Sequence, residues 1–498
     1  GEFVTAARDD LLSLGFETNL GSRSRSRTKL SFYRNADDVD VDALFRAEAR
    51  RSNAVDDQVG FSLADVVFTR GLSVRDLSAR QDFAWQASDR HLIESGGEVH
   101  SLSTAVSWRI AGDRNPSEAN GSSARGGVGL PSQLDSDLGG TRSGVYVQDR
   151  FQMMDRLVLE PGLRLDHSTV NGRAILQPRL AANVFLGGKT RLRLGGGLYA
   201  QSPGYEKLIQ SDYFLDLTAA RGIGLLHEKA IHAMFALERD LARGVNARVE
   251  GYYKRFLDRI IGRLETDAER LARVASYDFP PELRSSIPTA AQITSIPTND
   301  GQGRAYGVDV FVSRRAVSAE TRLTGWIGYA WGRANREAYG REYAFEYDRR
   351  HALNAVGRWR FGPRLEVGAT GKLYSGFPRT PVVGLRTAAV EVAQEGGATR
   401  LVPEVDALGG LVWTTDLGDV SNINESRLPL FARVDLRVDW KPRGDAGRWL
   451  FYLDVINVLA RENVGAYEAT LEHDPTSDRP RLVETPSISG DENRIADL

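Results

Sequence analysis

Hydrophobic and polar residues alternate strictly along residues 428–440, which read Leu-Pro-Leu-Phe-Ala-Arg-Val-Asp-Leu-Arg-Val-Asp-Trp. Every even-numbered position is apolar, and the odd-numbered positions from Arg433 onward hold arginines and aspartates. Successive side chains of a β-strand point to opposite faces, so the segment predicts a strand with one apolar and one charged face. A strand of about 9–11 residues crosses a bilayer when tilted, and a charge facing lipid costs about 2–4 kcal/mol near the midplane. The charged face is therefore predicted to line a water-filled barrel.

The same alternation recurs along most of the chain. The clearest segments are 156–166, 176–186, 245–254 and 364–373, and similar ones lie near 11–20, 25–34, 91–110, 142–153, 190–201, 227–240, 303–314, 319–333, 347–361 and 447–459. Residues 61–87 are predicted to form one long strand, with a bulge at Gly71 where the alternation slips. A period of two that is sustained in this way indicates strands, and the total is about sixteen or seventeen of them.

Short and long connections also alternate between these segments. Short connections fall near 154–155, 187–189, 241–243, 315–318, 361–363 and 442–446, and long ones at 202–226, 258–302, 334–346 and 376–427. We therefore predict an all-β fold, a transmembrane antiparallel up-and-down β-barrel with short periplasmic turns and long extracellular loops. Residues 264–274 predict a short helix inside one of these loops.

The amino-acid composition and residue spacing argue against several other classes of protein. Lys and Arg number 64 and Asp and Glu 66, so there is no basic field that would hold nucleic acid. Cysteine is absent, which excludes disulfides and thiolate metal sites. No apolar run of about 18 residues predicts a transmembrane helix. His227 and His232 are five residues apart rather than the four that a helical zinc site needs. We expect no enzymatic activity, no metal site and no cofactor.

The candidate functional residues are charged side chains that the alternation places on the lumen face. They could bond across neighbouring strands and keep the wall hydrated, or they could grip a plug domain or guide a polar solute. These residues are Arg156, Arg164, Arg179, Arg433, Asp435, Arg437 and Asp439. Aromatic residues gather near the predicted strand ends, which reflects either the ordinary preference of aromatic residues for strands or, as we expect, two girdles among the lipid headgroups.

Several segments resemble motifs of the TonB-dependent receptors. Residues 145–151 and 156–166 resemble the hairpin YVQDxW … RLTLxPGLRYD of that family, residues 177–180 its SPRL, 303–309 its GxAxGVE, 347–354 its DQRHxLN, 374–381 its SGxPxTP and 454–459 its DVxNLF. Asp149, Asp348 and His351 occupy motif positions. Each match is short, and their common order across residues 90–490 carries the resemblance.

The resemblance implies a barrel of about 22 strands in the bacterial outer membrane. Such receptors import scarce nutrients, namely siderophore–iron complexes, cobalamin or oligomers. The implied partners are outer-membrane lipid, the nutrient ligand and the TonB protein, which supplies energy and contacts the region before the barrel. The family also has an N-terminal plug and an aromatic residue at the end of its last strand. Because neither appears here, residues 1–490 are expected to be a partial barrel that lacks the plug and the first strands. Residues 491–498 are a polar tail that does not match a closing strand.

Two other functions share the alternating pattern. A passive porin-like channel would have the same wall, and an upstream plug sequence would distinguish the importer from it. A soluble or surface-anchored β-rich adhesin would stay monomeric without detergent. The substrate is not readable from the chain, and loops 258–302 and 376–427 are the candidates for ligand binding by their length.

Overall fold

The computed structural model describes residues 2–48, 60–112, 133–187, 189–204, 224–318, 320–393, 399–405, 409–444, 448–472, 474, 476 and 479–488. The predicted tail at 491–498 lies outside the described residues, as does most of the predicted loop at 202–226.

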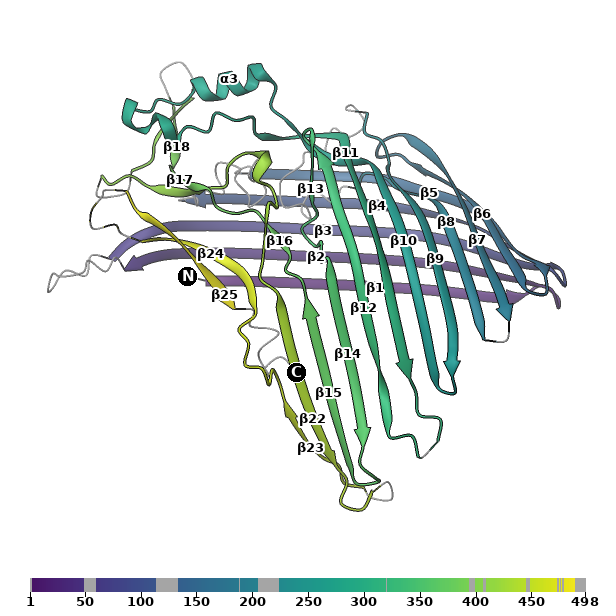
Figure 1. Cartoon of the computed structure of the whole chain (residues 1–498). Coiled ribbons are helices and arrows are strands. Elements are labelled where there is room, and N and C mark those ends of the chain that lie inside the picture. The colour runs from purple at the N-terminus through teal and green to yellow at the C-terminus, as the bar shows by residue number, and fades with distance from the viewer. Residues whose placement is uncertain are drawn as a thin grey trace.

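A 17-stranded antiparallel sheet forms the body of the protein. Its main strands are β1 (Glu2–Asn19), β2 (Ser24–Glu48), β3 (Gly60–Ser88), β4 (His91–Gly112), β5 (Gln133–Met154), β6 (Leu157–Ser168), β7 (Arg173–Gly187), β8 (Thr190–Gln201), β9 (Glu228–Ala242), β10 (Val245–Leu264), β11 (Ile293–Arg314), β12 (Leu323–Ala338), β14 (His351–Arg360), β15 (Leu365–Tyr374), β22 (Phe431–Trp440) and β23 (Phe451–Val455). Each of them pairs with the next one along the chain, and the short β13 (Arg341–Ala344) pairs with the C-terminal end of β12. Figure 1 shows these strands as a curved, twisted wall.

The up-and-down arrangement and its two unequal rims are confirmed. Connections after β1, β3, β5, β7, β9, β11 and β14 are short and meet at one rim, which we call the short-turn rim. The opposite rim, which we call the loop rim, carries the long connections after β10 and β15 (Figure 1). Within the described residues, β1 pairs with β2 alone and β23 with β22 alone, so the wall has two free edges there.

The loop rim carries further elements of its own. They are α3 (Asp267–Ala275), η2 (Pro281–Ser286), β16 (Pro378–Arg379), β17 (Gly384–Thr387), β18 (Ala389–Ala393), β19 (Thr399–Pro403), β20 (Trp413–Asp416), η3 (Val420–Asn422), β21 (Ser426–Arg427), β24 (Val464–Glu472) and β25 (Arg481–Ile488). Helix α3 confirms the helix predicted at 264–274. Its start is defined by a capping box, in which Thr266 and Glu269 bond reciprocally to each other's backbone N–H groups.

The bulge predicted at Gly71 is wrong. Residues 61–87 do lie in one strand, but the pairing of β3 passes Gly71 without a register shift, opposite Asp38 on β2 and Ser107 on β4. A Cβ atom at Gly71 would lie 3.0 Å from the Ser107 hydroxyl and 3.2 Å from the Asp38 carboxylate. Glycine therefore makes room for neighbouring side chains here and does not bend the strand.

Burial is inverted relative to a water-soluble protein. On β6, Leu163 and Leu165 are 42% and 44% exposed, whereas the side chains of Arg164 and Asp166 between them are only 22% and 24% exposed. In water-soluble proteins, charged residues are the more exposed ones. A sheet that shows its leucines outward and shelters its charges is suited to lipid on one side and water on the other. No helix in the described part of the chain has the length and apolarity to cross a membrane.

Candidate functional site

One face of the wall carries ion-paired charged side chains, on β3, β4, β6 and β22 among others, and we call it the polar face. On β22 it carries Arg433, Asp435, Arg437 and Asp439, because the alternation puts the apolar residues of that strand on the other side. Residues directly opposite each other in an antiparallel pair share a face. Residues 372, 370, 368 and 366 of β15 oppose these four residues, so the polar face continues from β22 into β15.

Short ion pairs hold the charges on β22. The Arg433 Nε lies 2.8 Å from the Asp435 Oδ1, and the Arg437 Nε lies 2.8 Å from the Asp439 Oδ1. Arg437 also contacts Asp454 on the adjacent β23 at 3.1 Å. Transfer of a charge from bulk water costs less free energy when the charge is paired in this way. The predicted charged ladder is therefore a set of ion pairs in which each arginine has a carboxylate close by.

A second network crosses four strands on the same face. On β3 the Arg80 Nε lies 2.8 Å from Asp82, and the Arg80 Nη1 lies 3.3 Å from Glu98 on β4. Arg164 on β6 joins Glu98 to Asp166, with 2.7 Å between its Nη2 and the Asp166 Oδ1. The network thus alternates guanidinium and carboxylate groups from β3 to β6.

Glycines give these long side chains their space. Gly144 on β5 lies under the Arg164 and Asp166 side chains, where a Cβ would overlap both of them. A Cβ on Gly162 would lie 3.0 Å from the Arg179 Cγ, and the Arg179 guanidinium lies 5.7 Å from the centroid of the Tyr199 ring on β8. Arg164 and Arg179 therefore each lie over a glycine of the preceding strand.

The structure places six of the seven predicted residues in strands of the polar face. Arg164 and Arg179 belong to its N-terminal half, and Arg433, Asp435, Arg437 and Asp439 to its C-terminal half. Arg156 differs, because it lies exposed in the turn between β5 and β6. The turn comes one residue later than the predicted 154–155, which moves Arg156 from the wall to the short-turn rim.

Asp348 anchors the longest described loop to the wall. Its side chain is 1% exposed, and its Oδ1 accepts a 2.7 Å hydrogen bond from the Ala334 N–H on β12. Its Oδ2 pairs with the Arg427 guanidinium, which also donates to the carbonyl oxygens of Asp348 at 2.8 Å and of Gly376 at 3.2 Å. Gly376 and Arg427 stand at the two ends of loop 376–427. The buried carboxylate therefore holds Arg427 against β12, and Arg427 in turn binds the Gly376 carbonyl oxygen at the other end of the loop.

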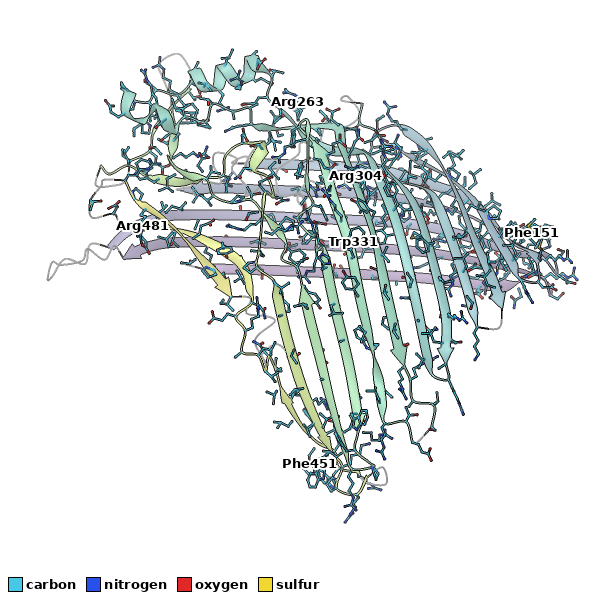
Figure 2. The ribbon with its side chains drawn as sticks, viewed as in Figure 1. Phe151, Arg263, Arg304, Trp331, Phe451 and Arg481 are labelled. Carbon is cyan, nitrogen blue, oxygen red and sulfur yellow. The ribbon has the colours of Figure 1, made fainter. Side chains whose placement is uncertain are left out.

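The other two motif positions lie on the opposite, apolar face. The Asp149 Oδ2 lies 2.6 Å from the His91 Nδ1, and the His91 ring stacks on Phe151 at 4.4 Å. Asp149 has the same parity as the exposed Val145 and Val147 of β5, which places it among lipid-facing residues. Figure 2 marks Phe151 at the short-turn end of its strands.

His351 lies instead near the loop rim, where its Nδ1 is 2.8 Å from the Tyr329 hydroxyl. The three motif positions, Asp149, Asp348 and His351, therefore do not form one site. The described residues contain no group of three or more His, Asp or Glu side chains that could hold a metal ion.

The long loops contact each other and form a cap over the loop rim. Tyr277, which follows α3, forms a backbone bridge with Leu401, and Asp278 pairs with Arg400 at 3.0 Å. Burial raises the pKa of the Tyr277 hydroxyl. These contacts join loop 258–302 to loop 376–427, the two loops that length alone had singled out.

A third segment, the β24–β25 hairpin, packs on the same cap. The Arg379 guanidinium donates to both carboxylate oxygens of Glu484, at 2.8 and 3.0 Å, and lies 4.4 Å from the centroid of the Tyr467 ring. Arg379 holds the pKa of Glu484 below its usual value. We did not predict this hairpin, because its strands bond to each other and carry no long alternating run. Nor does any local signal connect Arg379 to Glu484, which is 105 residues away.

The chain matches a model of one protein family over most of its length. The model, described as "TonB dependent receptor-like, beta-barrel", matches residues 3–458. No curated protein sequence matches the chain.

Solved structures share the fold at low sequence identity. The outer membrane transporter YddB from Escherichia coli is 12% identical with a TM-score of 0.56, and the match covers 93% of this chain and 60% of that one. The ferric citrate transporter FecA is 11% identical with a TM-score of 0.55, covering 97% and 60%. The copper transporter OprC is 13% identical with a TM-score of 0.53, covering 91% and 59%. The chain thus spans about 60% of the length of these transporters.

Proposed function

The chain belongs to the family of TonB-dependent receptor-like β-barrels, an outer-membrane protein family, and from this premise we propose that it forms the wall and loop cap of an active importer. The imported ligand is a scarce nutrient. Solved neighbours include transporters named for ferric citrate and for copper, and we propose a ligand of comparable scarcity, a siderophore–iron complex, cobalamin or an oligomer.

The inverted burial of the wall is the observation that supports this proposal best. Arg433 and Asp435 are 15% and 22% exposed, whereas Leu436 beside them is 39% exposed. Such a wall is stable with lipid against its apolar face and water or hydrated protein against its polar face. We propose that the polar face, with Arg164, Arg179 and the β22 residues, lines the lumen.

The polar face suits a plug or a passing solute because most of its charges are internally paired. A wall of neutral ion pairs offers hydrogen bonds without a strong field that would trap a charged ligand. We propose that ligand is recognised at the cap, where loops 258–302 and 376–427 meet, and that the TonB protein acts through parts of the protein other than this wall. We propose no catalytic role for any residue, in line with a family of receptors and transporters.

A passive porin-like channel is the competing function, since a hydrated wall alone also supports diffusion. The full-length protein would be expressed in cells that lack it, and uptake of labelled ferric chelates, cobalamin and glycans would be measured with and without a protonophore. We expect saturable uptake of one class that the protonophore abolishes. Uptake that is linear in concentration and insensitive to the protonophore, together with a permanent conductance in planar bilayers, would establish the porin and overturn our proposal.

A further inference from the structure

Three neighbouring strands repeat one pair of residues on the apolar face near the loop rim. Each has an aromatic residue and, two positions nearer the loops, an arginine. The pairs are Tyr253 and Arg255 on β10, Tyr306 and Arg304 on β11, and Trp331 and Arg333 on β12. We call these six residues the arginine–aromatic band. Figure 2 labels Arg304 above Trp331 on this part of the wall.

Register brings the members of the band side by side. Tyr253 is directly opposite Tyr306, and Arg255 directly opposite Arg304. The ring centroids of Tyr253 and Tyr306 are 6.5 Å apart, and those of Tyr306 and Trp331 are 6.0 Å apart. The three aromatic rings are thus neighbours, and on each strand the arginine lies about 7 Å nearer the loops than the aromatic residue. On β12 the pair is shifted by two residues, so that Arg333 is directly opposite Tyr306.

The band carries more positive than negative charge. Arg304 pairs with Glu342, and the Arg333 Nη2 lies 3.8 Å from the same carboxylate. Arg255 is exposed and makes no hydrogen bond or ion pair with the residues that the structure describes. The three guanidinium groups of the band thus have one carboxylate among them, Glu342, which contacts Arg304 and Arg333. On the polar face, by contrast, Arg433 and Arg437 each have a carboxylate close by.

We propose that the arginine–aromatic band binds a phosphate-bearing lipid headgroup in the outward leaflet of the membrane. Aromatic rings on a lipid-facing surface favour the headgroup level. Arginines just beyond them extend into the aqueous side of that level and avoid the cost of a charge in hydrocarbon. A guanidinium group binds phosphate with two parallel hydrogen bonds, and a cluster of three suits a headgroup with more than one phosphate. This inference depends on the membrane placement of the wall and not on the transported ligand.

Binding of defined lipids to the full-length protein tests the proposal. The protein would be held in an uncharged detergent and titrated with diphosphoryl lipid A, monophosphoryl lipid A and phosphatidylcholine, with native mass spectrometry as the readout. We expect affinity to fall in that order. R255Q/R304Q/R333Q should weaken diphosphoryl binding at least about tenfold, the equivalent of one lost interaction of about 1.4 kcal/mol. R314Q/R315Q/R322Q, which removes the same charge at the short-turn rim, should bind as the unmodified protein does.

Two controls keep the outcomes distinct. Migration of the unheated protein on a gel shows that both variants are folded, and nutrient uptake shows whether transport is intact independently of lipid binding. Inorganic phosphate at millimolar concentration should not displace the lipid if the headgroup within a membrane is the ligand. Equal binding by the band variant, equal loss in the control variant, or full displacement by inorganic phosphate would overturn the proposal.

Discussion

Replacement of Asp348 by alanine should release loop 376–427 from the wall. The substitution removes a carboxylate whose side chain is 1% exposed and which accepts hydrogen bonds from the Ala334 N–H and the Arg427 guanidinium. The Arg350 Nε also lies 3.7 Å from this carboxylate. Removing one partner of a buried ion pair costs about 3–5 kcal/mol. Because the Arg427 side chain is 26% exposed, water can solvate part of its charge, so we expect the lower end, about 3 kcal/mol.

Hydrogen exchange of individual backbone amides measures this loss of free energy separately in the loop and in the wall. The amides that pair β16 with β21 and β17 with β20 exchange through local opening of the loop. A loss of about 3 kcal/mol accelerates exchange roughly a hundredfold, while amides in the middle of β22 should keep their protection. The conservative variant D348N keeps an oxygen for the Ala334 N–H but loses the charge, so its acceleration should be smaller.

A double-mutant cycle with R427M decides whether the ion pair carries the effect. If it does, D348A and R427M should be strongly non-additive, with an interaction energy of about 1–3 kcal/mol. Unchanged exchange of the loop amides in D348A, or additivity of the two substitutions within about 0.5 kcal/mol, would refute the assignment of Asp348 as the anchor of the loop.

Three further predictions concern the cap and the wall. R379E should free the β24–β25 hairpin from the cap and R379E/E484R should restore it, as measured by limited proteolysis within 464–488; equal cleavage of both variants would contradict a specific pair. Hydrogen bonds from Arg263 and Thr266 lower the pKa of Glu269 from 4.5 to about 2. Because the pKa is lower in the folded state, the hydrogen-exchange protection of the α3 amides should be full above about pH 4.5 and fall as the pH drops toward 2. The variant E269Q should have less protection at neutral pH and show no such pH-dependent fall. L163R on the apolar face should cost about 2–4 kcal/mol of folding free energy near the midplane and reduce the folded fraction in lipid vesicles, as measured by the migration of the unheated protein on a gel. D435N on the polar face should reduce the folded fraction much less. Equal effects of the two substitutions would argue against lipid contact of the apolar face.

Sequence patterns predicted the features that depend on local periodicity. The alternation at 428–440 correctly assigns β22 and its two faces, because successive side chains of a strand point to opposite sides. The helix at 264–274 was predicted from its apolar spacing and is confirmed as α3. The predictions were wrong where contacts with other strands determine the local structure. A bulge was predicted at Gly71, but its neighbours Asp38 and Ser107 show that the glycine provides space for their side chains. Arg156 lies in a turn and not in the wall, because the hairpin closes one residue later than predicted.

The candidate site was predicted only in part for a physical reason. The identity of the charged side chains on the polar face follows from parity, but their partners depend on register between strands. Arg164 reaches Glu98 only because β4, β5 and β6 align Glu98, Gly144 and Asp166 in one row. Arg427 and Asp348 are 79 residues apart in the chain, and the sequence near either residue does not predict their contact.

By itself, then, the sequence determined that the chain is a two-faced, membrane-spanning antiparallel wall with a short-turn rim and a loop rim, because side-chain alternation and connection length are properties of neighbouring residues. Only the tertiary structure decided which charges neutralise each other, that a single buried aspartate holds a loop, that the motif positions are dispersed, and that three arginines form a band beside aromatic rings. Those features arise from register and loop packing, which bring together residues that are far apart in the chain.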